Sequence, residues 1–578
     1  MFKMKKINII LFAFLIVFVQ SSCSDFKDYN DDNGGLPGVG TKTLWENISE
    51  NSQLSNFAQL VKSSGMAEEL DAAHCYTVWA PLDGTYDAEA LKNTDPERVL
   101  KEFVKNHIAE FNHPLTGEVD ERIYTLNDKS HVFSNISGNK FGEAEIGTAN
   151  IPAINGVMHI LNNKETFRYS GYEYLDYVTG CDDYTNYLKG YEYKYLDEKA
   201  SVKGPIIRGL QTWIDSVMVV TNDLVFNDMR AKINEEDSDY VVLMPVDSAW
   251  AKVTSNAAKC FNYLTSFKWQ DLSATGTTTS RATAMTATLG TKDYKDSGLS
   301  IYQDSLSKST VAKNLVYSKN LGQNKQVFYD KVYSDNDTVY TTTHRQLTNV
   351  VKLMNSVIDS TKMSNGWTMR INDVPYLPWE TYNPEISTRS IGRSLTCTPQ
   401  NSSISKKKLD PAVCVLPDEM DQLSYIRAEA TTSSGKPELD FYLNNVRSTT
   451  YNIYVITVPA CAEDSAAERK PYSLFFDLSY TNASGALQKL QINKDEKNKK
   501  TAFETDPNKV DTICVLKNFT FPISYYGLDA APNLKVAHSV TSFTKTNREK
   551  YEQTLRIAAV VLRPIELDEA EPFIKEEE

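Results

Sequence analysis

The sequence predicts an α+β protein in which two copies of a domain of short strands and helices are followed by an all-β antiparallel sandwich. Its 578 residues are too many for one hydrophobic core and correspond to roughly three or four domains. A motif that begins at Tyr76 recurs at Tyr240. From about Arg389 onward the apolar residues alternate with polar ones, which is the period of a strand with one buried face.

The charge of the chain narrows the classes of partner. There are 75 Asp and Glu residues against 61 Lys and Arg residues, so the formal net charge is -14. An acidic surface favours solubility and repels phosphate backbones. We therefore expect no nucleic-acid partner.

The first residues have the pattern of a secretory signal peptide. Three lysines precede an apolar run from Ile9 to Val19, which is shorter than the roughly 20 residues of a membrane-spanning helix. Two serines then precede Cys23, and this arrangement resembles a bacterial lipobox, whose cysteine carries the acyl chains. We expect a signal peptide at residues 1–22 and a lipidated tether at residues 23–42. The alternative is ordinary cleavage, with Cys23 incidental.

Acidic residues follow Cys23 at positions 25, 28, 31 and 32. This run resembles the export signals of surface lipoproteins in Bacteroidetes. The resemblance implies a protein that is lipid-anchored in the outer membrane and displayed on the cell surface. A solvated tether would have the same composition.

The internal repeat consists of three marks in the same order. The first reads Y-x-V-x-x-P-x-D in both copies, at Tyr76 to Asp83 and at Tyr240 to Asp247. Lys-Asn follows at residues 105 and 313, and Asn-Gly at residues 155 and 365. The first two marks lie about three times farther apart in the second copy, so we expect an insertion there at about residues 268–305. It includes the stretch from Leu272 to Ser300, whose Ser, Thr, Ala and Gly indicate an exposed loop or a short helix pair rather than core.

These marks resemble the fasciclin (FAS1) family. Thr77 to Asp83 matches the strand and turn of that family, and Asn155 to Asn162 matches its closing strand. The resemblance covers roughly Leu44 to Pro384. It implies two wedges of short strands flanked by helices, at residues 43–166 and 167–385, of a kind used in adhesion and extracellular binding.

Two histidines of the first copy stand at positions of the family pattern, and we expect His107 and His159 to pack the wedge rather than to bind metal or transfer protons. Leu315 and Met369 replace them in the second copy. The sequence contains no nucleophile elbow, no H-E-x-x-H and no phosphate-binding loop. We therefore predict no catalytic residue, no metal site and no cofactor.

Residues 386–578 are expected to form the sandwich. Tyr451 to Val458 and Ile513 to Phe521 have the composition of strands, and Asn482 to Gly485 that of a turn. Two further strands are each expected to place four residues on one face: Leu474, Phe476, Leu478 and Tyr480, and Leu555, Ile557, Ala559 and Val561. A carbohydrate-binding or immunoglobulin-like sandwich is an analogy of fold only.

Two aromatic segments are candidates for ligand contact. The tyrosine-rich stretch from Tyr169 to Tyr195 joins the two copies, and its rings could stack on sugars, build a contact between domains, or be half buried at the junction. The proline-stiffened segment that follows Val374 contains Tyr376, Trp379 and Tyr382. We predict these three residues as ligand-binding, with Trp379 as the first choice.

Together these features predict a surface lipoprotein that acts as a binding or adhesion module and is not an enzyme. The expected partners are the outer membrane, through the acyl anchor, and SusC/SusD-like uptake proteins or an extracellular glycan. One alternative is a cell-surface glycan hydrolase that acts through the C-terminal domain, since folding could bring two carboxylates to about 5 to 9 Å. The other is a purely structural adhesin.

Overall fold

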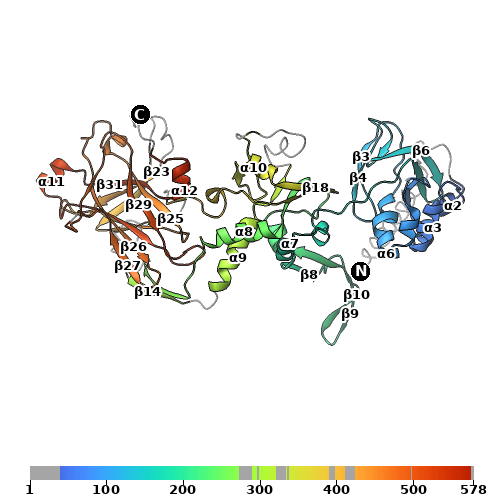
Figure 1. Ribbon diagram of the computed structural model, residues 1–578, viewed down its shortest axis with the longest axis horizontal. Helices are drawn as coiled ribbons and strands as arrows, with labels where there is room; N and C mark the ends of the chain where they lie inside the picture. The colour runs from blue at the N-terminus through green and yellow to red at the C-terminus, as the bar shows by residue number, and fades with distance from the viewer. Residues whose placement is uncertain are drawn as a thin grey trace, which may run out of the picture. The chain divides into compact units, whose positions relative to one another are not determined.

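The computed structural model describes residues 40–271, 290–295, 299–319, 334, 337–388, 397–409, 424–495 and 497–574. The predicted signal peptide, nearly all of the tether and Cys23 lie outside these residues. The chain divides into two compact units (Figure 1). The first contains residues up to Tyr177 with residues 232–240 and 361–368, and the second contains the remainder. No helix within the described ranges is long and apolar enough to cross a membrane.

The first unit is built on a seven-stranded sheet with the order β2-β1-β7-β6-β5-β4-β3. Strand β1 lies between β2, to which it is antiparallel, and β7, to which it is parallel. The strands are β1 (Tyr76–Pro81), β2 (Ile108–Glu110), β3 (Asp120–Tyr124), β4 (Ser130–Ser134), β5 (Lys140–Phe141), β6 (Ala144–Ala153) and β7 (Gly156–Leu161). The α-helices are α2 (Leu44–Ser49), α3 (Ser55–Ser63), α4 (Ala67–Asp71), α5 (Ala88–Lys92) and α6 (Pro96–Val99).

Both faces of β1 are buried, which explains its near-continuous apolar sequence. Val78 and Ala80 pack with the apolar faces of the helices, for example Phe57. Trp79 points into a second cluster, where its ring stacks on Phe141 with centroids 4.0 Å apart.

The first Asn-Gly mark, Asn155 and Gly156, holds the start of β7 close to β1. The side-chain amide of Asn155 donates to the carbonyls of Leu70 and Ala72, at 2.9 and 2.7 Å, and its oxygen accepts from the backbone N–H of Leu44. Gly156 has φ +149°, and a Cβ there would lie 1.9 Å from the carbonyl oxygen of Tyr76. Only glycine fits this close approach.

Most of a second sheet lies in the second unit, with the order β15-β12-β19-β18. Its strands are β12 (Tyr240–Pro245), β15 (Val316–Ser318), β18 (Val357–Met363) and β19 (Gly366–Ile371), and a small pair is formed by β16 (Val339–Tyr340) and β17 (Gln346–Leu347). The α-helices are α7 (Asp182–Lys189), α8 (Asp247–Ala258), α9 (Leu299–Ala312) and α10 (Val350–Asn355).

The second Asn-Gly mark makes the same contacts as the first. The amide of Asn365 donates to the carbonyls of Ile233 and Glu235, at 2.8 and 2.9 Å, and its oxygen accepts from the N–H of Gly171. Gly366 has φ +133°, and a Cβ there would lie 1.9 Å from the carbonyl oxygen of Tyr240. The repeated sequence marks therefore correspond to repeated geometry.

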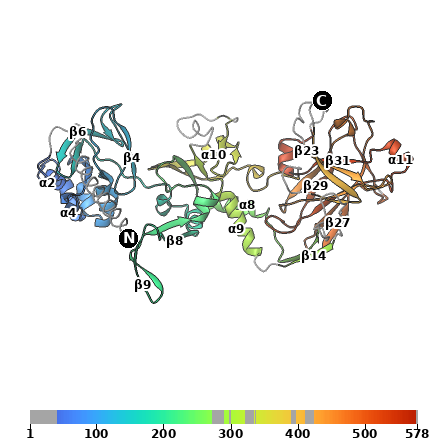
Figure 2. The same cartoon turned by 180° about the vertical axis from the view of Figure 1, so that it is seen from behind.

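Between α7 and β12 the chain forms a long two-stranded ribbon, residues 191–222, which we call the arm. Strand β8 (Glu192–Leu196) pairs with β11 (Met218–Asn222), and β9 (Val202–Ile207) pairs with β10 (Leu210–Asp215), both antiparallel. Figures 1 and 2 both show the β9–β10 end extending away from α7 and α8.

The C-terminal part is a pair of antiparallel sheets. One has the order β22-β23-β31-β25-β29, with β20 on β31, and the other has the order β21-β24-β30-β26-β27, with β28 on β26. The strands are β20 (Ile386–Ser387), β21 (Cys397–Gln400), β22 (Ser402–Lys408), β23 (Ser424–Ala430), β24 (Glu438–Tyr442), β25 (Thr450–Thr457), β26 (Ser473–Thr481), β27 (Leu487–Gln491), β28 (Phe503–Glu504), β29 (Asp511–Thr520), β30 (Asn533–His538) and β31 (Leu555–Pro564), with helices α11 (Lys545–Lys550) and α12 (Ile565–Ala570).

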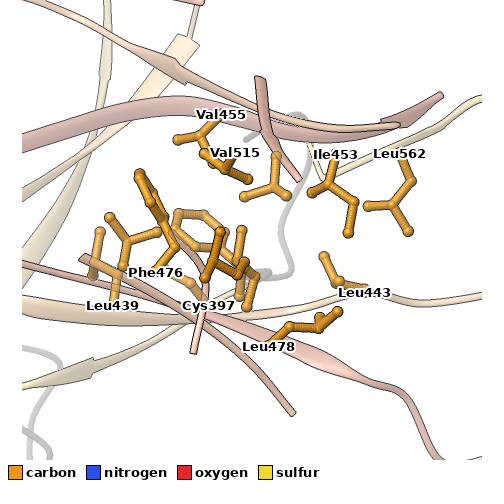
Figure 3. Close-up of a cluster of buried hydrophobic side chains, with 14 of the residues drawn as sticks. Cys397, Leu439, Leu443, Ile453, Val455, Phe476, Leu478, Val515 and Leu562 are labelled. Carbon is orange, nitrogen blue, oxygen red and sulfur yellow. The ribbon is translucent and has the colours of Figure 1, made fainter. Parts of the chain in front are cut away.

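The core lies between these two sheets. Figure 3 shows Ile453, Val455 and Leu562 from one sheet facing Phe476 and Leu478 from the other. The predicted strands at β25, β26 and β29 are confirmed, as is the turn before Gly485.

The prediction for β31 was wrong in its second half. A register shift against β25 makes Ala558 an extra residue. Such a bulge turns the side chains beyond it to the opposite face. Leu555 and Ile557 therefore face the main core as expected, but Ala559 and Val561 lie in a separate cluster behind the sheet.

Within the stretch expected to be an exposed loop or a short helix pair, Leu272 to Ser300, the described residues Gly290 to Lys295 form a strand instead. Residues on either side of 272–289, which lie outside the described part, form a hairpin of β13 (Ser266–Asp271) and β14 (Gly290–Lys295). The N–H of Lys268 donates to the carbonyl of Gly485 at 2.8 Å, and Phe267 and Trp269 belong to the sandwich core. Only the helical part, α9, agrees with the expected loop or helix pair.

Candidate binding surface on the two-stranded arm

The histidines of the first copy are fixed in the interior. His107 has Nδ1 2.7 Å from the carbonyl of Phe103, and its Nε2 accepts from the backbone N–H of Glu165 at 3.1 Å. His159 has Nε2 3.0 Å from the carbonyl of His113. Burial lowers the pKa of both rings to about 4, so both are neutral near pH 7. These contacts agree with the packing role expected for both residues.

The three aromatic residues predicted to bind ligand are not equally accessible. The hydroxyl of Tyr376 donates to the carbonyl of Asn314, and burial raises its pKa well above the usual value. Tyr382 is buried, and its carbonyl accepts from Nε of Arg447. Trp379 lies in a short 3₁₀ turn and is half buried. Ligand binding by these residues stays a prediction.

The tyrosine-rich segment contains both buried and exposed rings. Tyr184 in α7 is fully buried, with its ring centroid 4.9 Å from that of Trp250. Tyr177, which precedes α7, is exposed, as are Tyr193 and Tyr195 in β8. The last two belong to the arm.

Exposed apolar side chains are concentrated on the arm. In the part of the chain that the structure describes, 20 large hydrophobic residues are exposed, and 11 of them lie between Tyr191 and Val220. The most exposed are Leu210 (73%) and Ile214 (75%). A soluble domain rarely gathers such residues without a partner that covers them.

The geometry of the ribbon exposes these residues on both faces. Arg208 and Gly209 have φ of +53° and +80°, which is the turn that suits the twist of a two-stranded hairpin. Ile207 pairs with Leu210, and Ile206 pairs with Gln211, so the two isoleucines point to opposite sides. A lone hairpin of this kind is only marginally stable in water.

The distal half of the arm is basic within an acidic chain. From Lys199 to Asp215 the sequence has three cations, Lys199, Lys203 and Arg208, and one carboxylate, Asp215, whereas the arm as a whole has four basic and four acidic residues. Lys203 also places its Nζ 6.0 Å from the centroid of the Trp213 ring. This half of the arm therefore suits a partner that is both apolar and negatively charged.

Two other surfaces were weaker candidates. A cleft of about 530 Å³ between α7, α8 and α9 is lined by Asp183, Gln303 and Asp304, but its Trp250 is almost entirely buried. On the sandwich, the aromatic side chains of the described residues from 397 to 574 are buried or half-buried, for example Tyr480 and Tyr551. The described residues also contain no cluster of three or more potential metal ligands.

Comparison with known proteins identifies one domain. Residues 52–163 match the family described as Fasciclin domain, so this part of the chain is a fasciclin domain, a class usually related to adhesion. The structure is similar to a FAS1 domain pair from the insect cell adhesion molecule Fasciclin I, at 13% identity and a TM-score of 0.21, over 57% of this chain and 99% of that one.

The C-terminal sheets resemble family 22 carbohydrate-binding modules. One is from Clostridium thermocellum Xyn10B, at 10% identity and a TM-score of 0.19, over 31% of this chain and 91% of that one. Another is the xylan-binding domain from Paenibacillus barcinonensis Xyn10C, at 12% identity and a TM-score of 0.18, over 31% and 92%. The search of curated proteins found no match.

Proposed function

We propose that this protein is an acyl-anchored surface lipoprotein that binds other components of the cell surface through its arm and catalyses no reaction. The concentration of exposed apolar residues between Tyr191 and Val220 carries this proposal. The fasciclin domain at residues 52–163 supports an adhesive role.

Anchoring is proposed at Cys23, from the sequence around it. Incorporation of labelled palmitate by the wild-type chain, and its loss in Cys23→Ser, tests the acyl bond. Protease treatment of intact cells tests display on the outside. For the chain as a whole we propose association with a SusC/SusD-type uptake system, which co-purification from outer membranes tests.

We also infer that the second copy, around residues 167–385, is a divergent fasciclin-type domain. The shared contacts of Asn155 and Asn365 support this, because both amides bridge two carbonyls and accept one N–H. The absence of the family histidines there does not affect these contacts, which involve the Asn-Gly mark alone.

The binding role of the arm is tested with the Cys23→Ser chain added to washed cells of its own source. We expect saturable binding of the Cys23→Ser chain to the cells, with an affinity that is at least tenfold lower when Leu210→Asp is added. Ile136→Asp is the matched control, because Ile136 is 61% exposed on the fasciclin domain. Equal binding by all three chains would refute the role of the arm, and release of sugar from surface glycans would favour the hydrolase alternative.

A further inference from the structure

We infer that the distal end of the arm, Val202 to Asp215, binds an anionic lipid surface. The inference rests on the proposed binding function of the arm and names its partner. Three properties of this segment support it: the directions of its apolar side chains, its charges, and the hydrogen bonds of its backbone polar groups.

Apolar side chains surround the tip of the ribbon. Leu210 and Ile207 share one face, and Ile206, 69% exposed, lies on the other. A protein that docks against one face leaves the opposite face in water. The boundary between lipid headgroups and acyl chains takes up apolar side chains from all sides of an inserted segment.

The charges favour anionic headgroups. Lys203 and Arg208 lie within the segment, and its one carboxylate, Asp215, lies at the base, where it pairs with Val202. Long basic side chains extend from an apolar stem to lipid phosphates, and tryptophans such as Trp213 prefer this boundary.

The backbone of the tip is protected against strand addition. The register of β9 and β10 is irregular around Trp213, and side chains satisfy the carbonyls there: Nε2 of Gln211 donates to Gly204, and Oγ1 of Thr212 donates to Pro205. Pro205 has no N–H to offer to another strand. Satisfied carbonyls lower the cost of leaving water, whereas bulges and proline discourage edge-to-edge pairing.

The test uses the Cys23→Ser chain and vesicles of phosphatidylcholine with and without phosphatidylglycerol, in a flotation assay. We expect binding only with phosphatidylglycerol, weakened by added salt. Lys203→Gln should lower the partition coefficient about fivefold, and Leu210→Asp at least tenfold. Ile136→Asp and Lys140→Gln are matched controls on the fasciclin domain, where both side chains are exposed. Circular dichroism checks that each variant is folded.

Three results would overturn the inference. The first is no binding to phosphatidylglycerol vesicles, and the second is binding that Leu210→Asp leaves unchanged. The third is a dimer of the wild-type chain that Leu210→Asp dissociates, which would identify a second copy as the partner. If vesicles do not bind but Leu210→Asp still weakens binding to cells, the partner is a protein and the proposed function stands. If neither assay responds to Leu210→Asp, both proposals fail.

Discussion

Replacing Trp269 by alanine should destabilise the C-terminal sandwich, although Trp269 belongs to an insertion in the preceding domain. Its side chain is 6% exposed, and its ring lies edge-on to Tyr442 with centroids 6.3 Å apart. Truncation of a buried tryptophan to alanine costs about 3–5 kcal/mol. For a domain of this size we expect a decrease in melting temperature of about 10 °C. Trp213→Ala on the arm is the control, with an expected cost below about 1 kcal/mol.

The assay is hydrogen exchange of wild type and Trp269→Ala, followed in peptides from β26 and β27. If the hairpin is part of the sandwich, exchange in these strands should accelerate about 100-fold or more. A cost below about 1 kcal/mol, or faster exchange in β13 and β14 alone, would show that the hairpin detaches by itself. Phe267 and Trp269 would then not stabilise the sandwich core.

Three other substitutions test the interior. Asn155→Ala and Asn365→Ala each remove three hydrogen bonds, so each should lower the free energy of unfolding by about 2–4 kcal/mol. Urea titrations measure this loss. A much smaller loss for Asn365→Ala would contradict the equivalence of the two Asn-Gly marks. His107 has a pKa of about 4 when folded and about 6.5 when unfolded, so the unfolded chain binds the extra proton between these values. The stability it contributes, at most about 3 kcal/mol, should be fully present above pH 6.5 and lost as the pH falls toward 4. His107→Gln should flatten this part of the wild-type pH profile, and an unchanged profile would refute the assignment.

The sequence predicted those features that depend on local pattern. The Asn-Gly marks were recognisable because only glycine tolerates the positive φ and the approach to Tyr76 or Tyr240. Strand β26 was recognisable because Leu474, Phe476 and Leu478 alternate with less apolar residues over one unbroken register.

Features that depend on distant contacts were not predictable. The bulge at Ala558 adds one residue without changing the apolar composition of β31. Phe267 and Trp269 border a low-complexity stretch, and nothing local shows that their partner is a sheet formed some 200 residues later. In the arm, Ile206 and Ile214 have the composition of a buried strand, and only the fold shows that both side chains are left exposed by the described part of the chain. The arm was therefore missed, although the Arg-Gly turn at its tip was visible in the sequence.

The β13–β14 hairpin also constrains how this chain can be rearranged in evolution or in the laboratory. The polypeptide enters the sandwich at Ser266, returns to α9, and enters again at β20. If the chain were cut once before β20 and the C-terminal part moved to another protein, the sandwich would lack the core residues of the β13–β14 hairpin. The remaining N-terminal part would keep this hairpin without the sheet on which it packs. The second copy, residues 167–385, and the sandwich should therefore be inherited, recombined and expressed together.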